Sequence, residues 1–280
     1  MNQETFDFED GKGPVPAHRH KNPDGTTGGW VAETATVEAT ATIGSDARVF
    51  GDAQVFDNAG VYGQARVSGN ARVCGDVWVG QDARVFGQAQ VFNGAVVSNK
   101  AQVYGNARIY GLAQVYGEAK VCDQANVYGH ALVFDQAQVS GDARVFDDAR
   151  VSGNARVFGQ AEVYGEAKVC DQANVSGKAR VYGKTRVFGK TEVSEKVQVS
   201  GNAWVCDNAK VSGNARVFGY ARVSGDTNLS GDAEVSGSAR VFGNTVLSGD
   251  VVVSVSSLRA ELENIQARRA QVQGKRVIGW

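Results

Sequence analysis

A six-residue repeat runs without insertion or deletion through most of this 280-residue chain. Every sixth residue from Val31 to Val253 is Val, Ile or Leu, at all 38 positions. The residue two places earlier is Ala in 30 of these repeats, and the residue between the two is mostly polar. Because alternate residues of a strand point to the same side of a sheet, the Ala and the Val are expected to face inward and the polar residue outward. A short fixed period of this kind predicts a repeat protein built of very short strands.

A bend residue follows each of these short strands. Between Gly51 and Gly249 the position two places after the aliphatic residue is Gly, Asp or Asn in 32 of 34 repeats, and the exceptions are Gln81 and Glu195. Gly, Asp and Asn tolerate a positive φ best, so we predict a left-handed bend at every repeat. A helix is excluded because a period of six drifts around a 3.6-residue helix, and an antiparallel sandwich would need longer strands. A coil of short parallel strands remains, with each turn stacked on the turn below.

The hexapeptides ARVFGD, ARVSGN and AQVYGN resemble the repeats of the hexapeptide-repeat family. That resemblance implies an all-β fold: a left-handed parallel β-helix of triangular cross-section, with three hexapeptides in each turn. It covers residues 29–254 and implies about 12 turns of about 18 residues each. Most repeats here place the small bend residue one position later than that family does, so a right-handed β-helix is the alternative.

The N-terminal segment, residues 1–28, falls outside the repeat and holds all three prolines. The stretch GPVPAHRHKNPDGTTGGW, which begins in it, resembles the leader of hexapeptide arrays encoded by phages and prophages. We expect this segment to cap the first turn, with Trp30 covering the end of the core.

The C-terminal segment, residues 255–280, loses the six-residue period. Its apolar residues fall on one face of an α-helix, and Gly274 followed by two basic residues is a stop signal. We predict an amphipathic helix that either caps the last turn or associates with copies of itself. The apolar face consists of Leu258, Leu262, Ile265 and Val272.

Composition narrows the classes of partner. The 29 Lys and Arg against 30 Asp and Glu give a net charge of −1, so we do not expect nucleic acid as a partner. No apolar run is long enough to span a bilayer, and the start MNQETFDFED lacks the apolar core of a secretory signal. We therefore expect no membrane partner and a cytoplasmic location, in a bacterial host if the chain is phage-encoded. The cysteines are expected to be free thiols, since only Cys170 and Cys206 share a column and they lie two turns apart, beyond the reach of a disulfide; the four are Cys74, Cys122, Cys170 and Cys206.

The repeat carries no recognisable catalytic constellation. Many hexapeptide-repeat proteins are acyltransferases, and the resemblance implies that such an enzyme places a histidine on a loop that projects from the coil. The repeat here has no inserted loop, and His130 is the only histidine within it. His18 and His20 lie far from it in the leader, so the three-histidine zinc site of relatives resembling carbonic anhydrase is not expected. We predict a non-enzymatic protein without metal or cofactor; the alternatives are an acyltransferase with its site between subunits and a filament-forming scaffold.

Sorting the chain by the length of one predicted turn produces two columns of candidate binding residues. The position after the aliphatic residue carries an aromatic ladder, and the outward position of the adjoining face carries a basic row. The ladder is expected to be structural stacking, with a platform for a sugar, a peptide or a partner protein as the alternative. Carboxylates on neighbouring bends, such as Asp148 and Glu166, would neutralise the basic row, or an anionic partner would. The aromatic ladder is Phe92, Tyr110, Tyr128, Phe146, Tyr164 and Tyr182, and the basic row is Arg150, Lys168, Arg186, Trp204, Arg222 and Arg240.

Earlier turns of the outward position that carries the basic row hold apolar residues instead. Exposed apolar residues in a line suggest a contact with another copy of the protein. These candidate contact residues are Trp78, Val96 and Leu132, together with Leu258, Leu262 and Ile265 of the predicted helix. We therefore predict a rigid β-helical rod that displays side-chain ladders for partner binding or self-association. The partner protein is not identified by the sequence, and a homo-oligomer is one of the arrangements it leaves open.

Overall fold

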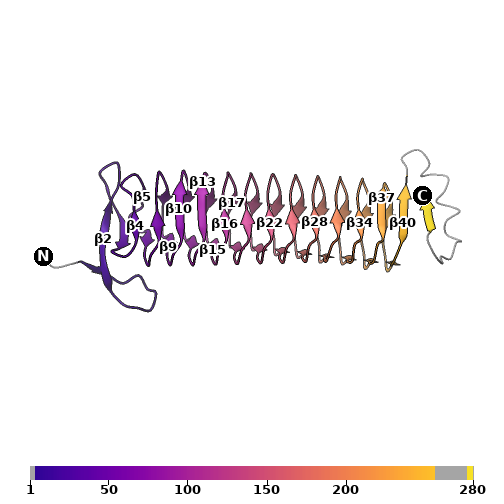
Figure 1. Ribbon diagram of the computed structural model, residues 1–280, viewed down its shortest axis with the longest axis horizontal. Helices are drawn as coiled ribbons and strands as arrows, with labels where there is room; N and C mark the ends of the chain where they lie inside the picture. Colours follow the sequence, from indigo (N-terminus) through magenta and orange to yellow (C-terminus); the bar gives the residue numbers. More distant parts are fainter. Residues whose placement is uncertain (1–3, 256–275, 280) are drawn as a thin grey trace. The chain divides into compact units, whose positions relative to one another are not determined.

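The computed structural model describes residues 4–255 and 276–279. All the regular secondary structure in this described part is β-strand. The chain divides into two compact units, Met1–Asp142 and Ala143–Trp280. In each unit, short parallel strands stack turn on turn and form three sheets (Figure 1).

In unit 1, most strands contain two residues, the polar and the aliphatic residue of the repeat. The first sheet has the order β1 (Thr5–Phe6), β2 (Val15–Lys21), β3 (Thr27–Ala32), β6 (Arg48–Val49), β9 (Arg66–Val67), β12 (Arg84–Val85), β15 (Gln102–Val103), β18 (Lys120–Val121) and β21 (Gln138–Val139). The second sheet has β4 (Thr36–Val37), β7 (Gln54–Val55), β10 (Arg72–Gly75), β13 (Gln90–Asn93), β16 (Arg108–Ile109) and β19 (Asn126–Val127). The third sheet has β5 (Thr42–Ile43), β8 (Gly60–Val61), β11 (Trp78–Val79), β14 (Val96–Val97), β17 (Gln114–Val115) and β20 (Leu132–Val133).

Unit 2 repeats this arrangement. Its first sheet has the order β24 (Arg156–Val157), β27 (Asn174–Val175), β30 (Glu192–Val193), β33 (Lys210–Val211), β36 (Asn228–Leu229) and β39 (Val246–Leu247). Its second sheet has β22 (Arg144–Val145), β25 (Glu162–Val163), β28 (Arg180–Val181), β31 (Gln198–Val199), β34 (Arg216–Val217), β37 (Glu234–Gly237), β40 (Val251–Val255) and β41 (Arg276–Gly279). Its third sheet has β23 (Arg150–Val151), β26 (Lys168–Val169), β29 (Arg186–Val187), β32 (Trp204–Val205), β35 (Arg222–Val223) and β38 (Arg240–Val241).

The register confirms the predicted length of a turn. Val49 pairs with Val67 in parallel, and Val151 pairs with Val169 in the same way, so each pair joins equivalent residues of adjacent turns three hexapeptides apart. The third sheet contains six strands in each unit, in agreement with the predicted number of turns. An all-β parallel β-solenoid with three sheets is therefore the fold of the chain.

The core consists of the inward pair of each repeat. Ala47 and Val49 are fully buried, as are their equivalents in nearly every turn. Small and β-branched side chains in stacked columns fill the interior closely, and each buried Val contributes about 1.5 kcal/mol or more in transfer terms. Thr replaces Ala in this inward column at three fully buried positions, Thr185, Thr191 and Thr227.

The bends have the predicted left-handed backbone. Even the two exceptional residues adopt it, with φ of 59° at Gln81 and 62° at Glu195. Several acidic bend residues also accept a hydrogen bond from the backbone N–H of the glycine one turn later. The Oδ2 of Asp123 accepts from Gly141 at 3.0 Å, and the Oε2 of Glu195 accepts from Gly213 at the same distance. A carboxylate at the bend thus joins adjacent turns.

The N-terminal segment forms antiparallel strands that lead into the solenoid. β1 pairs with β2 and β2 with β3, and β3 then pairs in parallel with β6. Phe8, rather than Trp30 alone, supplies the buried contact: it is 1% exposed and its ring stacks on Phe50 at 4.9 Å. Trp30 is half-buried and stacks on Phe6 at 4.6 Å.

The predicted C-terminal helix falls mostly outside the described residues. Leu258, Leu262, Ile265 and Val272 all lie in residues 256–275, outside the described part. The helix was predicted within residues 255–280. At the two ends of this range the structure has strands: β40 ends at Val255, and β41 (Arg276–Gly279) pairs with β40 in parallel.

Candidate functional site

The basic row lies in one line on the third sheet of unit 2. Its residues occupy the outward position of six consecutive strands, and each pairs in register with the next. Neighbouring parallel strands lie about 4.8 Å apart, so the row presents one side chain at each such step. The five cations are exposed and Trp204 is half-buried; the cations are Arg150, Lys168, Arg186, Arg222 and Arg240.

None of these five cations forms an ion pair with a residue of the described part of the chain. Glu166, which was expected to neutralise the row, pairs instead with Lys184 at 3.5 Å. Asp171 and Asp207, on bends beside the row, accept hydrogen bonds from glycine N–H groups of the next turn at 3.0 and 2.9 Å. Glu166 therefore does not pair with the row, because it binds Lys184; neutralisation of the row by other nearby carboxylates such as Asp148 stays a prediction.

Trp204 separates the cations in the middle of the row. The guanidinium of Arg222 lies 4.4 Å from the Trp204 ring centroid, and that of Arg186 lies 5.0 Å from it. Because these arginines lie on the two strands that flank β32, the indole contacts a guanidinium from both sides. Cation–π contacts of this kind attract a cation to the ring and hold the two guanidiniums in place.

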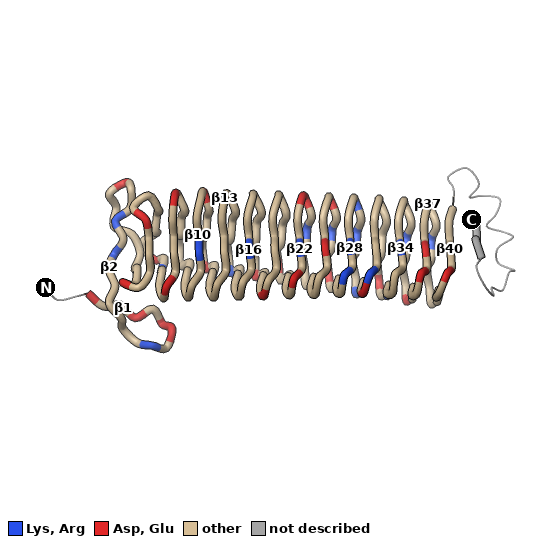
Figure 2. The backbone as a smooth tube through the Cα atoms, viewed as in Figure 1, with Lys and Arg blue, Asp and Glu red and all other residues tan. Residues whose placement is uncertain are grey.

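The second sheet of unit 2 shows the opposite arrangement. Its outward cations alternate with glutamates, and Glu162 lies 3.6 Å from Arg144 and 3.1 Å from Arg180. Farther along the same sheet, Arg216 pairs with Glu234 at 3.6 Å. The same solenoid thus carries one face with interleaved charges and one face with a row of cations. Figure 2 shows Lys and Arg interspersed with Asp and Glu around β28.

The aromatic ladder stacks as predicted within each unit. In unit 1 the ring centroids of Phe92, Tyr110 and Tyr128 follow one another at 4.8 Å, with nearly parallel planes. In unit 2, Tyr164 lies 4.7 Å from Phe146 and 4.9 Å from Tyr182. Each central ring is covered on both faces by its neighbours. The contacts are those of structural stacking, and a binding role for the ladder stays a prediction.

Two further pairs of aromatic rings stack on each other and were not predicted from the sequence. Phe86 stacks on Tyr104 at 4.9 Å, and Tyr116 stacks on Phe134 at 5.1 Å. The two rings of each pair lie one turn apart in the chain, so the same sorting by turns would have found them. A side-chain hydrogen bond with Cys122, together with burial, raises the pKa of Tyr104 to about 12.

The proposed apolar contact residues differ in exposure. Trp78 is 42% exposed, but Val96 and Leu132 are half-buried, and Gln114 lies between them on the same sheet. The expectation of three exposed apolar residues was therefore correct for Trp78 alone. Tyr62, with its ring centroid 6.2 Å from that of Trp78, joins it as an exposed aromatic pair.

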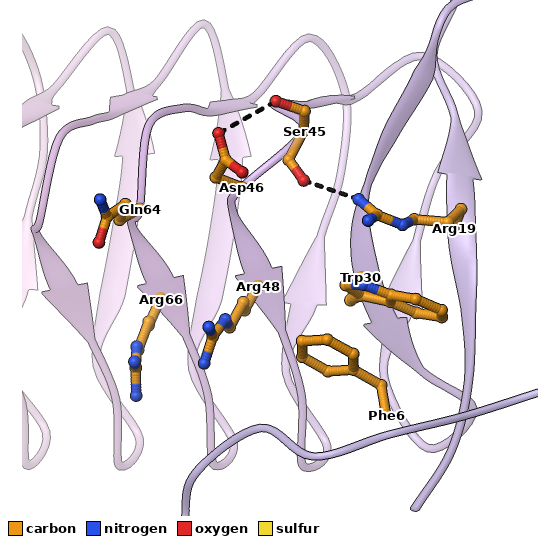
Figure 3. Close-up of a pocket in the computed structure, with 8 residues that line it drawn as sticks. All are labelled: Phe6, Arg19, Trp30, Ser45, Asp46, Arg48, Gln64 and Arg66. Carbon is orange, nitrogen blue, oxygen red and sulfur yellow. Dashed lines mark hydrogen bonds between the residues drawn. The ribbon is translucent and has the colours of Figure 1, made fainter.

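A pocket of about 290 Å³ lies where the N-terminal segment meets the first sheet of unit 1 (Figure 3). Stacked groups line one side of it: Arg19 lies 4.6 Å from the Trp30 ring, and Arg48 lies 5.3 Å from the Phe6 ring. The sequence pattern could not show this pocket because Phe6 and Arg19 come from outside the repeat. The lining residues are Phe6, Arg19, Trp30, Ser45, Asp46, Arg48, Gln64 and Arg66.

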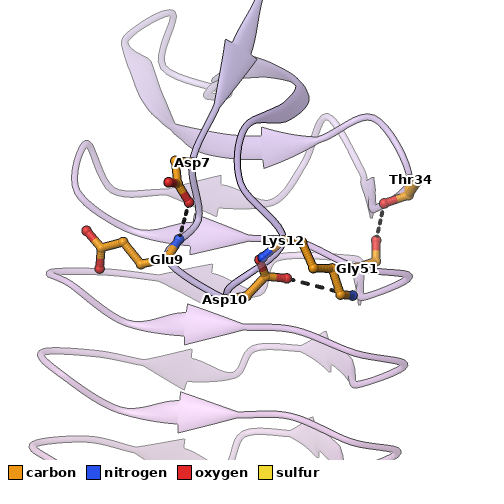
Figure 4. Close-up of polar contacts among 6 residues, drawn as sticks. All are labelled: Asp7, Glu9, Asp10, Lys12, Thr34 and Gly51. Carbon is orange, nitrogen blue, oxygen red and sulfur yellow. Dashed lines mark hydrogen bonds and ion pairs between the residues drawn. The ribbon is translucent and has the colours of Figure 1, made fainter.

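Glu9 joins the N-terminal loop to two of these arginines. Its Oε2 lies 2.6 Å from Arg66 and 3.0 Å from Arg48. The contact with the Arg48 guanidinium and then the hydrogen bond donated by Arg66 hold the pKa of Glu9 below its ordinary value. Figure 4 shows that the loop is tied internally, since Asp7 accepts a hydrogen bond from the N–H of Glu9 at 2.8 Å. Asp10 likewise accepts from the N–H of Lys12 at 3.1 Å.

The histidines of the N-terminal segment have structural partners. His18 Nδ1 lies 2.7 Å from Glu33, and the buried His20 contacts the Ala41 carbonyl at 3.0 Å. Among residues 4–255 and 276–279, no group of three or more His, Cys, Asp and Glu side chains converges as metal ligands would. The same residues include no helix with the length and hydropathy needed to cross a membrane.

All four cysteines are half-buried free thiols. Burial is the main cause that raises the pKa of each, and it raises that of Cys206 to about 11. The protonated thiol is therefore the stable form at neutral pH, and it is a weak nucleophile.

The three stacked sheets, the constant register between turns and the outward ladders define a β-solenoid repeat protein. Five segments of the chain match the model of the YdcK Beta solenoid repeat family, and in these segments the chain is similar to repeats of that family; the segments are residues 65–81, 101–117, 137–150, 149–165 and 209–225. Each segment lies in the repeat region. No curated protein matches the chain significantly.

Proposed function

We propose that this protein is a non-enzymatic interaction module: a rigid β-solenoid that displays side chains in fixed columns for partner binding. The observation that carries the proposal is the basic row. Its cations are held in register and exposed, and they form no ion pair with described residues, although the second sheet of the same unit neutralises its cations.

Preorganisation is the physical basis of this function. Backbone pairing fixes the spacing of the row, and Trp204 limits the freedom of Arg186 and Arg222. Because these side chains are already ordered, binding a partner costs less conformational entropy than it would on a surface of flexible side chains. The stacked rings of the aromatic ladder add stiffness along the adjoining edge.

Finer features of the proposal rest on the resemblance to hexapeptide-repeat proteins. They are the left-handed sense of the coil, a phage or prophage origin, a C-terminal helix and a cytoplasmic location in a bacterial host. Hexapeptides such as ARVSGN and the leader stretch before Trp30 support them.

A second candidate function is self-association, favoured by the aromatic pair of unit 1. Tyr62 is 37% exposed and Trp78 is 42% exposed, and together they form an apolar patch on the third sheet. Aromatic residues of this kind are enriched at protein interfaces. Light scattering of the wild type and of Trp78→Ser tests this candidate: a larger wild-type species that shrinks in the variant supports it, and two identical monomers contradict it.

The basic row is tested by capture from bacterial lysate on the immobilised full chain. The double variant Lys168→Gln/Arg186→Gln removes two charges from the row, and the matched control Arg144→Gln/Arg180→Gln removes two from the second sheet. We expect material that binds the wild type and the control but is lost with the row variant. Equal capture by all three proteins would contradict the proposal.

A further inference from the structure

We infer that the basic row is a binding track for single-stranded nucleic acid, with phosphates held by the row and bases stacked on exposed rings beside it. This inference rests on the proposed function, for which it names the ligand. The sequence argued against nucleic acid because the whole chain has a net charge of −1. Net charge hides how charges are distributed over the faces of a solenoid, and the structure places five cations on one sheet face.

The carboxylates that flank the row are largely engaged elsewhere. Glu166 pairs with Lys184, and Asp226 accepts a hydrogen bond from Asn208 at 2.9 Å. Asp171 and Asp207 accept from the backbone N–H groups of the next turn. Asp148 forms no ion pair with a described residue, and Lys190 adds a positive charge to the flank. The guanidinium groups in the centre of the face therefore keep their donors for an external anion.

The chemistry of the row suits phosphate. Four of its five cations are arginines, and a guanidinium can donate two parallel hydrogen bonds to a phosphate. From Arg150 to Arg240 the row spans five strand spacings, about 24 Å. A track of that length can hold several consecutive phosphates, which is the scale of a short single-strand site of about four nucleotides or more.

Exposed aromatic rings lie beside the C-terminal half of the row. Tyr220, two residues before Arg222, is 67% exposed, and Phe242, two residues after Arg240, is 69% exposed. Neither ring belongs to a stack in the described part of the chain, whereas Trp204 contacts guanidiniums from both sides. Tyr220 and Phe242 thus offer the open faces on which bases stack without sequence preference, while Trp204 positions the arginines.

The exposed rings of Tyr220 and Phe242 favour one class of polyanion over the others. A duplex hides the faces of its bases, so it would use the row and leave both rings unoccupied. An acidic polypeptide or a polyuronate would also be attracted by the row, but it carries no flat aromatic base to stack on Tyr220 or Phe242. A single strand is the polyanion that uses both features, because its phosphates and the faces of its bases are accessible together.

The test is fluorescence anisotropy with a labelled oligothymidine of about 12 nucleotides, titrated with the full chain over a series of salt concentrations. For five phosphate contacts on a single strand, the slope of log K against log salt should be about −3.5. The variant Lys168→Gln/Arg186→Gln should reduce the magnitude of that slope by about 1.4, and Arg144→Gln/Arg180→Gln should leave it unchanged. Tyr220→Ala should weaken binding about fivefold or more with an unchanged slope.

Competition identifies the class of ligand. We expect unlabelled oligothymidine to displace the probe better than a duplex of equal length, poly-glutamate or polygalacturonate. If any of these competes equally well, or if Tyr220→Ala binds as the wild type does, the inference is overturned. If the probe does not bind while lysate capture still depends on the basic row, the inference fails and the proposed function stands. If the probe does not bind and lysate capture does not depend on the basic row, both the inference and the proposed function are contradicted.

Discussion

The guanidinium of Arg222 lies 4.4 Å from the ring centroid of Trp204, and the two residues are one turn apart in the chain. This contact exists because the chain completes one circuit of the solenoid between them and so places both side chains on the outer face of neighbouring strands. Arg186 makes the equivalent contact from the preceding turn, at 5.0 Å. The row can therefore stack arginines in register although like charges on adjacent strands repel.

The first prediction concerns this contact. Trp204→Leu should lower the free energy of unfolding by about 1–2 kcal/mol, because it removes two cation–π contacts. The matched control is Trp78→Leu, at the same outward position of the third sheet in unit 1, where Gly60 and Val96 are the in-register neighbours and no cation of the described residues stacks on the ring. Urea unfolding measures both; an equal loss in the two variants would contradict the role of the arginines.

The second prediction concerns the solenoid interior. Thr185 and Thr191 are fully buried, and their hydroxyl groups have no hydrogen-bond partner among the described residues. Replacement by Val keeps the shape and removes the unsatisfied hydroxyl, so each variant should be stabilised by about 1 kcal/mol or more. Thermal unfolding of each variant measures the effect.

Thr227→Val is the control for these two substitutions. The Thr227 hydroxyl donates to the Ser224 carbonyl at 2.6 Å, so its loss should destabilise the protein by about 1 kcal/mol. If all three variants shift the melting temperature in the same direction, the assignment of unsatisfied hydroxyls at positions 185 and 191 is wrong.

The repeat region could be predicted to the level of single columns because its period is fixed. Once the length of a turn is known, the stacking of Tyr110 on Phe92 follows from residue numbers alone, and so would the stack of Phe86 on Tyr104. Partner choice among charged side chains could not be predicted in this way. Glu166 had Lys184 within reach as well as the basic row, and only the side-chain geometry shows which it binds.

The N-terminal segment was beyond prediction for a different reason. Phe8 and Glu9 belong to no repeat, so no column fixes their positions. Their contacts with Phe50 and Arg66 join parts of the chain that are distant in sequence, and they depend on how the antiparallel strands enter the first sheet. Local sequence signals do not determine such contacts.

The third prediction concerns Glu9 and pH. Its pKa is lowered in the folded protein by the contact with Arg48 and the hydrogen bond donated by Arg66. The pairing therefore stabilises the loop at pH values above the ordinary carboxyl pKa, and this stabilisation is lost as the pH falls through the lowered value. The protection factors of the amides of residues 7–13, which correct for the intrinsic pH dependence of hydrogen exchange, should fall over that acid range in the wild type.

Glu9→Gln should show low protection factors for these amides already at neutral pH, with little further change in acid. Asp46→Asn, which changes an acidic residue that lines the pocket beside Arg48 and Arg66, should behave as the wild type. Exchange in Glu9→Gln that matches the wild type at neutral pH would show that the ion pairs do not hold the loop.

The fourth prediction concerns Tyr104. Its pKa of about 12 arises first from the hydrogen bond with Cys122 and then from burial. In Cys122→Ala the pKa should fall toward the ordinary tyrosine value, and Cys206→Ala should leave it unchanged. Ultraviolet titration of each protein against the same protein carrying Tyr104→Phe isolates this residue among the eight tyrosines. An unchanged pKa in Cys122→Ala would show that the thiol is not its partner.

The measurement that bears most directly on the central claim is pyrene excimer emission, because every column depends on residues three hexapeptides apart lying side by side. Cys122 and Ser140 occupy equivalent positions one turn apart, whereas Phe134 comes only two hexapeptides after Cys122, at the end of a strand of another sheet. In a background with the other three cysteines replaced by Ser, pyrene maleimide on Cys122 and Ser140→Cys should give strong, concentration-independent excimer emission, and Cys122 with Phe134→Cys should give none. Excimer emission from the second pair and its absence from the first would contradict a turn of three hexapeptides.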